Sequence, residues 1–199
     1  SKMDDKKIIA RHEVAHLLGI IIAGLYNEFV NMTCQPSGQV NGQTVRNGNS
    51  LTEYSQHLAS DIPNYLKVIK EEGRPVVLRN LCYVFGGGSY DRLTGNESDV
   101  RNSIDNQIIR SMLLPALSVV NVSDERYAEL QKMVDAYLHP IFEANACLIE
   151  EIAEVLLERG TINKAEMDQL IAEKSWVLPT PKADFEGLQA QFDTWLSNS

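Results

Sequence analysis

Cysteine is scarce in this chain and poorly placed for cross-linking. Three cysteines, Cys34, Cys82 and Cys147, occur among 199 residues, and no pair has the C-x-x-C spacing. An odd number at wide spacing argues against a disulfide framework. It favours a reducing compartment, because disulfides persist in oxidising ones. We therefore expect a cytoplasmic protein, or a protein of an organelle stroma or matrix from which a transit peptide was removed.

Long hydrophobic runs, an excess of positive charge and a nucleotide-binding motif are also missing. No stretch reaches the roughly 18 uninterrupted apolar residues that a membrane helix needs, so we expect no membrane span in this chain. The net charge of −9 argues against nucleic acid as a partner, because its phosphates require a basic surface. The sequence contains no Walker A motif, so we expect no ATPase activity from this chain itself.

What the chain does contain is the composition of an ordinary globular domain. Hydrophobic residues make up 44% and charged residues 23%, and a chain of this length can bury a core without disulfides. Apolar residues recur at helical spacing over most of the chain. Residues 28–46 differ, because two β-leaning stretches flank the turn-forming Pro36-Ser37-Gly38. The sequence thus predicts a mainly α-helical fold with a small β-hairpin or sheet.

The hydrophobic periodicity also predicts where the helices lie and which sides they bury. Helices are expected over residues 4–26, 60–70, 76–93, 100–117, 123–159, 161–173 and 185–196. In the helix over 100–117, the side expected to be buried carries Ile104, Ile108, Met112 and Leu113. Pro140 is expected to kink or break the long helix that contains it.

One motif inside the first helix points to chemistry. His12, Glu13 and His16 form an H-E-x-x-H sequence, and positions four apart lie on the same face of a helix. The two histidines can therefore direct their imidazoles at one ion, and such a pair suits Zn²⁺, which in catalytic sites keeps a position open for water. Glu13 lies on the flank of that face, within reach of such a water. A third ligand is still needed, and the alternative interpretation is a chance pattern.

Three consecutive glycines, Gly86-Gly87-Gly88, interrupt the otherwise apolar helix over 76–93. Each glycine inside a helix costs about 1 kcal/mol relative to alanine. This cost indicates that another element packs very close there, and the histidine helix is the candidate. A phosphate-cradling loop is the rival interpretation, but the rest of a P-loop or a G-x-G-x-x-G fingerprint is missing.

Four stretches, in order along the chain, together resemble the zinc peptidase domain of one family, FtsH. The members of this family are membrane-bound AAA-type proteases. The four stretches are the charged lead-in with the H-E-x-x-H motif, the Gly-Gly helix with its acidic end, the polar loop after it, and the closing helices, at residues 4–16, 81–93, 94–100 and 142–162. The resemblance implies an FtsH peptidase-like fold for residues 1–172. Residues 173–199 are then a C-terminal tail that packs on this domain or on a partner.

The sequence departs from the family pattern in several places. Ala15 stands where the family usually has glycine, and Gly88 and Ser89 replace the expected arginine and alanine. Residues 28–75 match poorly, and the family's substrate-binding edge strand would lie there. The ATPase that unfolds substrates in FtsH has no counterpart in this sequence.

The resemblance implies a role for each residue of the site. Zinc would be bound by His12, His16 and Asp99. Glu13 would act as the general base, taking a proton from the attacking water and delivering it to the leaving amine. Asp91 lies where the family carries an acid near the site. It would support a histidine from behind or form a surface salt bridge.

Other assignments of the third ligand stay open. His57 and His139 compete with Asp99 and rank below it. Asp99 itself has a plain structural role as an alternative, because aspartate often caps the start of a helix.

The sequence therefore predicts a stand-alone zinc endopeptidase of FtsH-like type that acts on peptides or unfolded protein segments. The alternative is a catalytically inactive FtsH-like module that binds zinc or other proteins. Retention of Glu13 favours the enzyme, because a structural zinc site does not need that carboxylate. Folded substrates would require a further partner, and the candidates are a separate ATPase and further copies of this chain.

Overall fold

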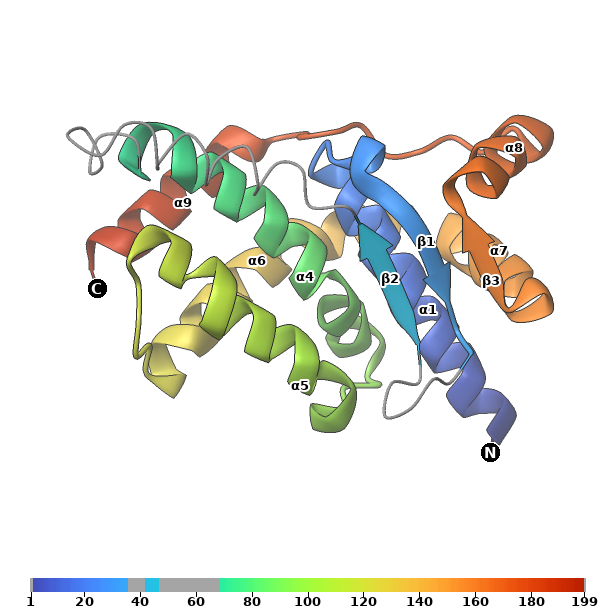
Figure 1. Cartoon of the computed structure of the whole chain (residues 1–199), viewed down its shortest axis with the longest axis horizontal. Coiled ribbons are helices and arrows are strands. Elements are labelled where there is room, and N and C mark those ends of the chain that lie inside the picture. Colours follow the sequence, from blue (N-terminus) through green and yellow to red (C-terminus); the bar gives the residue numbers. More distant parts are fainter. Residues whose placement is uncertain (1, 36–41, 47–68, 199) are drawn as a thin grey trace.

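The computed structural model of the chain describes residues 2–35, 42–46 and 69–198. It is mainly helical, with a small three-stranded antiparallel sheet (Figure 1). The prediction of a mainly α-helical fold with a small β element is thereby confirmed. The predicted turn at 36–38 and the predicted helix start at 60–63 lie outside the described residues.

Two helices, α1 (Lys2–Ile22) and α4 (Arg74–Thr94), cross at the centre of the fold. Every residue of α1 from His12 onwards is buried, as expected of a helix that is packed on all sides. The crossing is close because glycine stands at the contact. A Cβ atom on Gly86 would lie 2.8 Å from the carbonyl oxygen of Ala15. The prediction that the glycine run packs against the histidine helix is confirmed.

The sheet has the strand order β2-β1-β3, so β2 and β3 are its edge strands within the described part of the chain. The strands are β1 (Phe29–Thr33), β2 (Gln43–Arg46) and β3 (Thr161–Asn163). Met32 pairs with Thr44 on one side and with Ile162 on the other, and all three are buried. The pairing of β1 with β2 was predicted. β3 was not, because its few residues read as a turn before a helix.

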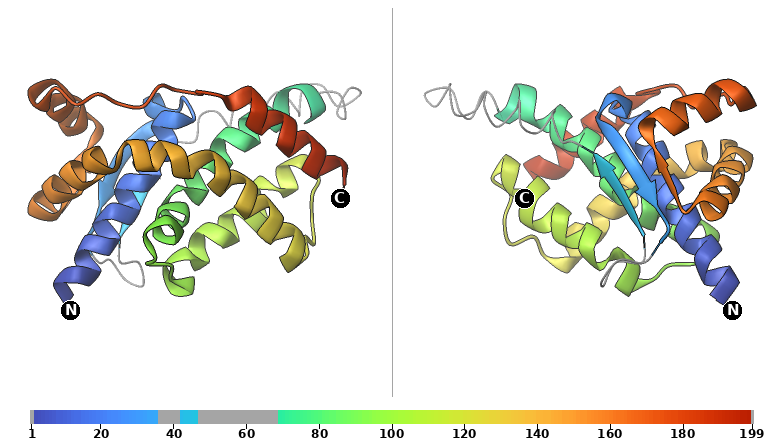
Figure 2. Two further views of the ribbon diagram at one scale, coloured as in Figure 1. Left: turned by 180° about the vertical axis from the view of Figure 1, so that it is seen from behind. Right: turned by 45° about the vertical axis from the view of Figure 1, so that its right-hand side comes forward.

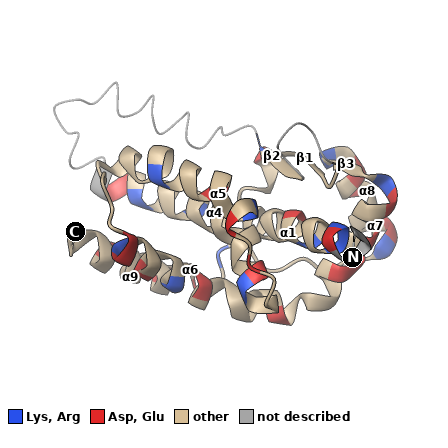
Figure 3. Cartoon of the chain, turned by 90° about the horizontal axis from the view of Figure 1, so that it is seen from below, with Lys and Arg blue, Asp and Glu red and all other residues tan. Residues whose placement is uncertain are grey.

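Further helices surround this centre. They are η1 (Tyr26–Glu28), η3 (Ile69–Gly73), α5 (Asp99–Ile108), η4 (Ile109–Leu113), η5 (Pro115–Leu117), α6 (Asp124–Ala144), α7 (Ala146–Arg159), α8 (Lys164–Lys174) and α9 (Phe185–Ser197). Charged residues of both signs are interspersed along them (Figure 3). None of the described helices is long and apolar enough to cross a membrane, in agreement with the sequence.

The long predicted helix over 123–159 is in fact two helices. Pro140 lies inside α6, and the helix is interrupted only at Asn145, between α6 and α7. Asn145 has left the helical conformation, with φ −113° and ψ 18°. Its side chain donates a hydrogen bond to the carbonyl oxygen of Ile141. Asparagine competes with the helix in this way through its own side chain, which is why the break comes after the proline.

The C-terminal tail packs on the rest of the chain. Figure 2 shows it crossing the molecule from α8 to α9. The backbone N–H of Lys182 donates to the carbonyl oxygen of Ile22. Leu188, Phe192 and Trp195 of α9 are buried, and α9 lies against α6 and α4. The tail thus contributes to the same hydrophobic core as the histidine helix.

The burial of α5 is the reverse of the prediction. Its buried residue is Asn102, whereas Ile104 is 47% exposed. Met112, in the π-helical turn after α5, is 62% exposed. Leu113 is buried as predicted, and Ile108 is partly buried. The periodicity showed an apolar face on this helix correctly, but the assumption that this face points into the core was wrong.

Candidate metal centre

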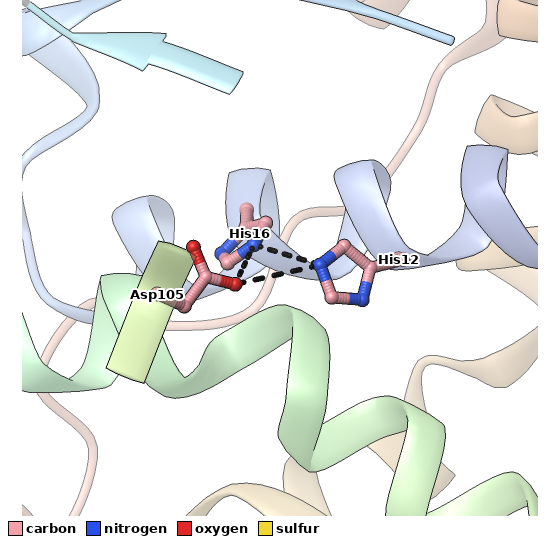
Figure 4. A group of neighbouring side chains, drawn as sticks. All are labelled: His12, His16 and Asp105. Atoms are coloured by element: carbon pink, nitrogen blue, oxygen red, sulfur yellow. Dashed lines mark hydrogen bonds and ion pairs between the residues drawn. The ribbon is translucent and has the colours of Figure 1, made fainter. Parts of the chain in front are cut away.

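Three side chains from two helices converge beside the crossing of α1 and α4 (Figure 4). The Nε2 atoms of His12 and His16 are 3.1 Å apart. Asp105 enters from α5, and its Oδ2 atom lies 3.1 Å from Nε2 of His16 and 3.5 Å from Nε2 of His12. Both histidines are buried. The predicted pairing of the two histidines on one helix face is therefore present, together with a third group from a distant part of the chain.

The hydrogen bonds of the other ring nitrogens determine which nitrogens face the centre without a proton. Nδ1 of His16 lies 2.8 Å from the carbonyl oxygen of Tyr83, which can only accept, so Nδ1 carries the hydrogen. Nδ1 of His12 likewise donates to Oδ2 of Asp91 at 2.8 Å. A neutral imidazole has one N–H, so both Nε2 atoms present lone pairs whenever the two rings are neutral. In that protonation state no hydrogen reaches Oδ2 of Asp105, which lies beside them.

Three converging electron-pair donors require a cation or added protons, and their spacing fits a metal. Zinc binds histidine nitrogen and carboxylate oxygen at about 2.0–2.1 Å, which gives a tetrahedral ligand–ligand edge of about 3.3–3.4 Å. The observed separations of 3.1, 3.1 and 3.5 Å lie on either side of that value. Two imidazoles and one carboxylate are also a common donor set for zinc. The residues present therefore fit a zinc ion.

The glycine run supplies the room for such an ion. A Cβ atom on Gly87 would lie 2.5 Å from Nε2 of both His12 and His16. Any other residue at this position would place its side chain against the two ligand atoms. The absent side chain leaves space on the α4 side of the group, which explains why the helix carries glycine although glycine destabilises it.

Nearby carboxylates oppose the effect of burial on the pKa values of the two histidines. Burial disfavours the charged form of His12, but hydrogen bonds to Asp105 and Asp91 outweigh this effect and raise the pKa to about 10. Burial would also raise the pKa of Asp105, but the adjacent His16 and the hydrogen bonds from both histidines hold it well below its usual range. The environment thus favours positive charge between these groups. In the absence of a metal, protons supply that charge.

Asp99 is not brought to the histidines, and the carboxylate that lies beside them is that of Asp105. Asp99 is exposed at the first turn of α5 and lines a separate polar cavity with Asn102 and Asn106. The two aspartates are six positions apart, a rotation of about 240° on an α-helix, so they face different sides. Asp99 is not the helix cap either, because the side chain of Ser98 accepts from the backbone N–H of Arg101.

The other candidate ligands do not join the group. His57 lies outside the described residues. His139 is on α6, where its Nε2 atom contacts the carbonyl oxygen of Ser89 at 3.0 Å. Asp105 itself was missed because Ile104, its neighbour, was assigned to the buried side. The sequence did contain a signal for Asp105. If the apolar face of α5 points outwards and not into the core, Asp105, which adjoins that face, comes to lie near the two histidines.

Asp91 supports the centre from behind. It is 1% exposed, so a surface salt bridge is not its role. Its Oδ2 atom accepts from Nδ1 of His12 and, at 3.1 Å, from Nε of Arg101. A carboxylate in this position sets the tautomer and orientation of a ligating histidine.

Glu13 lies beside the group without belonging to it. Its side chain is buried, and its Oε1 atom accepts a hydrogen bond of 2.8 Å from the hydroxyl of Thr44 on β2. Burial raises the pKa of Glu13, and the nearby His16 and His12 offset part of the shift. A carboxylate with a raised pKa is better matched to taking up a proton near neutral pH.

A cleft of about 210 Å³ opens onto these residues. Gln43 and Thr44 of β2 line one wall, and α5 forms the other. Tyr83 of α4 also lines the cleft, and its hydroxyl donates to the carbonyl oxygen of Thr44 at 2.6 Å. This bond ties the edge strand to the helix that carries the glycines. The cleft therefore joins the candidate ligands, the buried carboxylate and an edge strand.

Comparisons with known protein families, with curated proteins and with solved structures found no match. A function for this chain must therefore be inferred from the chemistry of the site.

Proposed function

We propose that this chain is a zinc-dependent endopeptidase with an FtsH peptidase-like fold, acting on peptides or unfolded protein segments without an ATPase of its own. His12, His16 and Asp105 hold the ion, and Glu13 is the general base. The observation that carries the proposal is the convergence of three potential ligand atoms, two imidazole nitrogens and a carboxylate oxygen, at tetrahedral spacing. The buried carboxylate of Glu13 in the same cleft supports peptide hydrolysis as the reaction.

The roles of the side chains follow from their contacts. Zinc at this centre would supply a Lewis acid that polarises the substrate carbonyl and acidifies a water. Asp91 and the Tyr83 carbonyl hold the two imidazoles in the ligating tautomer. Thr44 holds the carboxylate of Glu13. Glu13 takes the proton of the attacking water and passes it to the leaving amine.

The edge strand supports a polypeptide substrate. β2 is an edge strand of the sheet in the described part of the chain, and its residues Gln43 and Thr44 line the cleft. Extended peptides bind such edges through main-chain hydrogen bonds. A folded protein rarely offers a free extended segment, which restricts the substrates to peptides and unfolded chains.

The exposed apolar side chains of α5 favour a second candidate function, an inactive FtsH-like module that binds zinc and a partner protein. Exposed apolar groups next to a cleft are typical of interaction sites. The position of Glu13 argues for the enzyme, because a buried carboxylate is costly to retain where it has no function.

The two functions are separated by one substitution. The wild-type protein, Glu13→Gln and the control Glu154→Gln, an exposed position on α7, are loaded with zinc and incubated with a fluorescent unfolded casein. We expect all three to bind about one zinc, and only Glu13→Gln to lose hydrolysis, by roughly 100-fold or more. Zinc binding by all three with no hydrolysis by any would favour the interaction module.

A further inference from the structure

The two faces of helix α5 are buried in the reverse of the usual way, with its polar face against the protein and most of its apolar face exposed. An ordinary amphipathic helix buries its apolar face and exposes its polar face. On α5 the buried residue is Asn102, and Asp99, Asn102 and Asn106 line a polar cavity shared with residues of α4 and α6. Val100 and Ile104 are instead 82% and 47% exposed. Of the apolar side chains of this helix, Ile108 packs against the core, whereas Val100 and Ile104 contribute little to it.

These apolar side chains line the cleft of the metal centre. Val100, Ile104 and Ile108, each four positions from the next, form one wall of it; we call these three residues the apolar wall. Ile104 immediately precedes Asp105, which faces the histidines. The apolar wall is therefore adjacent to the ligand atoms, on the opposite side of the cleft from β2.

We propose that the apolar wall selects substrate segments that carry a bulky aliphatic or aromatic side chain next to the bond to be cut. This inference rests on the proposed peptidase function and specifies its substrate class. A peptide that pairs with β2 is extended, so alternate side chains point to the same side. One of them enters the cleft and buries itself against Ile104 and Val100. Unfolded proteins expose such side chains, whereas folded proteins bury them.

The size of the cleft supports a single large side chain as the occupant. A volume of about 210 Å³ is below that of most small-molecule sites. It exceeds the roughly 150 Å³ that accommodates a benzene ring in an apolar protein cavity. The polar residues of the opposite wall, Gln43 and Thr44, suit the peptide backbone. The two walls thus match the two parts of an extended apolar peptide.

The test uses Ile104→Ser and the matched control Val120→Ser. Ile104 is half exposed, so its replacement leaves the fold intact, and Val120, 61% exposed, lies outside the cleft. Two peptides differing only by leucine or serine next to the scissile bond are compared by kcat/KM. We expect wild type and Val120→Ser to prefer leucine by about tenfold or more, and Ile104→Ser to lose most of this preference. An unchanged preference in Ile104→Ser overturns the inference.

A binding measurement separates this inference from the proposed function. Fluorescein-labelled forms of both peptides are titrated with zinc-loaded protein carrying Glu13→Gln, with and without Ile104→Ser, and followed by anisotropy. Leucine-dependent binding that Ile104→Ser weakens supports the apolar wall, even where wild type hydrolyses nothing. Equal binding of the two peptides overturns it, even where hydrolysis is robust. A dimer in sedimentation velocity that Ile104→Ser dissociates, with peptide binding unchanged, would make the wall an interface between copies.

Discussion

Nδ1 of His12 lies 2.8 Å from Oδ2 of Asp91, a residue 79 positions away on the neighbouring helix. This contact orients Nε2 towards His16 and Asp105. It couples the geometry of the centre to the crossing of α1 and α4, because each helix contributes one partner.

The first prediction concerns this contact. Asp91→Asn keeps an acceptor for His12 but removes the negative charge that makes the imidazole a stronger ligand. We expect zinc affinity to fall by about 10–100-fold, measured by competition with a chromophoric chelator. Asp99→Asn is the matched control, because Asp99 is exposed and lines a different cavity. Equal affinities of Asp91→Asn and wild type would contradict the role of Asp91.

The second prediction concerns which aspartate is the third zinc ligand. His12→Ala and His16→Ala should abolish binding of about one zinc per chain, since each removes a ligand. Asp105→Ala should weaken binding by more than about 100-fold, whereas Asp99→Ala should bind like wild type. Metal content after gel filtration and chelator competition measure this. The reverse order of the two aspartate variants would restore Asp99 as the ligand.

Gly87→Ala provides the third prediction. Its methyl group would lie 2.5 Å from Nε2 of both histidines, so the imidazoles must move apart and zinc binding should be lost. Gly187→Ala is the control, because nothing lies within 4 Å of its added Cβ atom on α9. Relief of the helix penalty should stabilise that variant by about 0.5–1 kcal/mol. Thermal unfolding and zinc titration report both effects, and tight zinc binding by Gly87→Ala would exclude the proposed position of the ion.

The fourth prediction is a pH dependence. Folding of the metal-free protein raises the pKa of His12 from 6.5 to about 10. Protonation of His12 therefore contributes to the stability of the metal-free fold. This contribution is complete below a pH of about 6.5 and is lost as the pH rises through about 10. We expect the melting temperature of chelator-treated protein to fall over that window more steeply than that of His12→Gln.

Zinc uptake gives a second readout of the same groups. Zinc replaces the protons between the ligands, so its binding near neutral pH should release protons. The release is measured with an indicator dye in weakly buffered solution. Zinc binding without proton release would show that His12 is neutral in the metal-free protein.

Much of the centre was readable from local sequence. His12 and His16 face the same way because the period of the helix places positions four apart on one side, whatever surrounds it. The glycine run indicated a close helix contact because glycine within a helix needs a compensating reason. The helical class followed from periodicity in the same way.

The proposed third ligand could not be read in this way. Asp105 and the histidines lie on separate helices, and only packing decides which side of α5 faces α1. Periodicity identified an apolar and a polar face on α5, but the usual rule that the apolar face is buried selected the wrong one. The polar face of α5, with Asn102 buried, lies towards the body of the protein. That docking turns Ile104 and Asp105 towards the cleft and Asp99 away from it.

The sequence by itself therefore determined the pairing of His12 and His16, the position of Glu13 beside them on α1, and the glycine run of α4 that packs against α1. Each of these depends on the geometry of one helix. The tertiary structure alone decided that Asp105 completes the group, that Asp91 lies behind His12, and that β3 joins the sheet. These relations depend on contacts between segments distant in the chain. The free energy of such contacts comes from the surfaces that meet, which the spacing of residues within one segment does not specify.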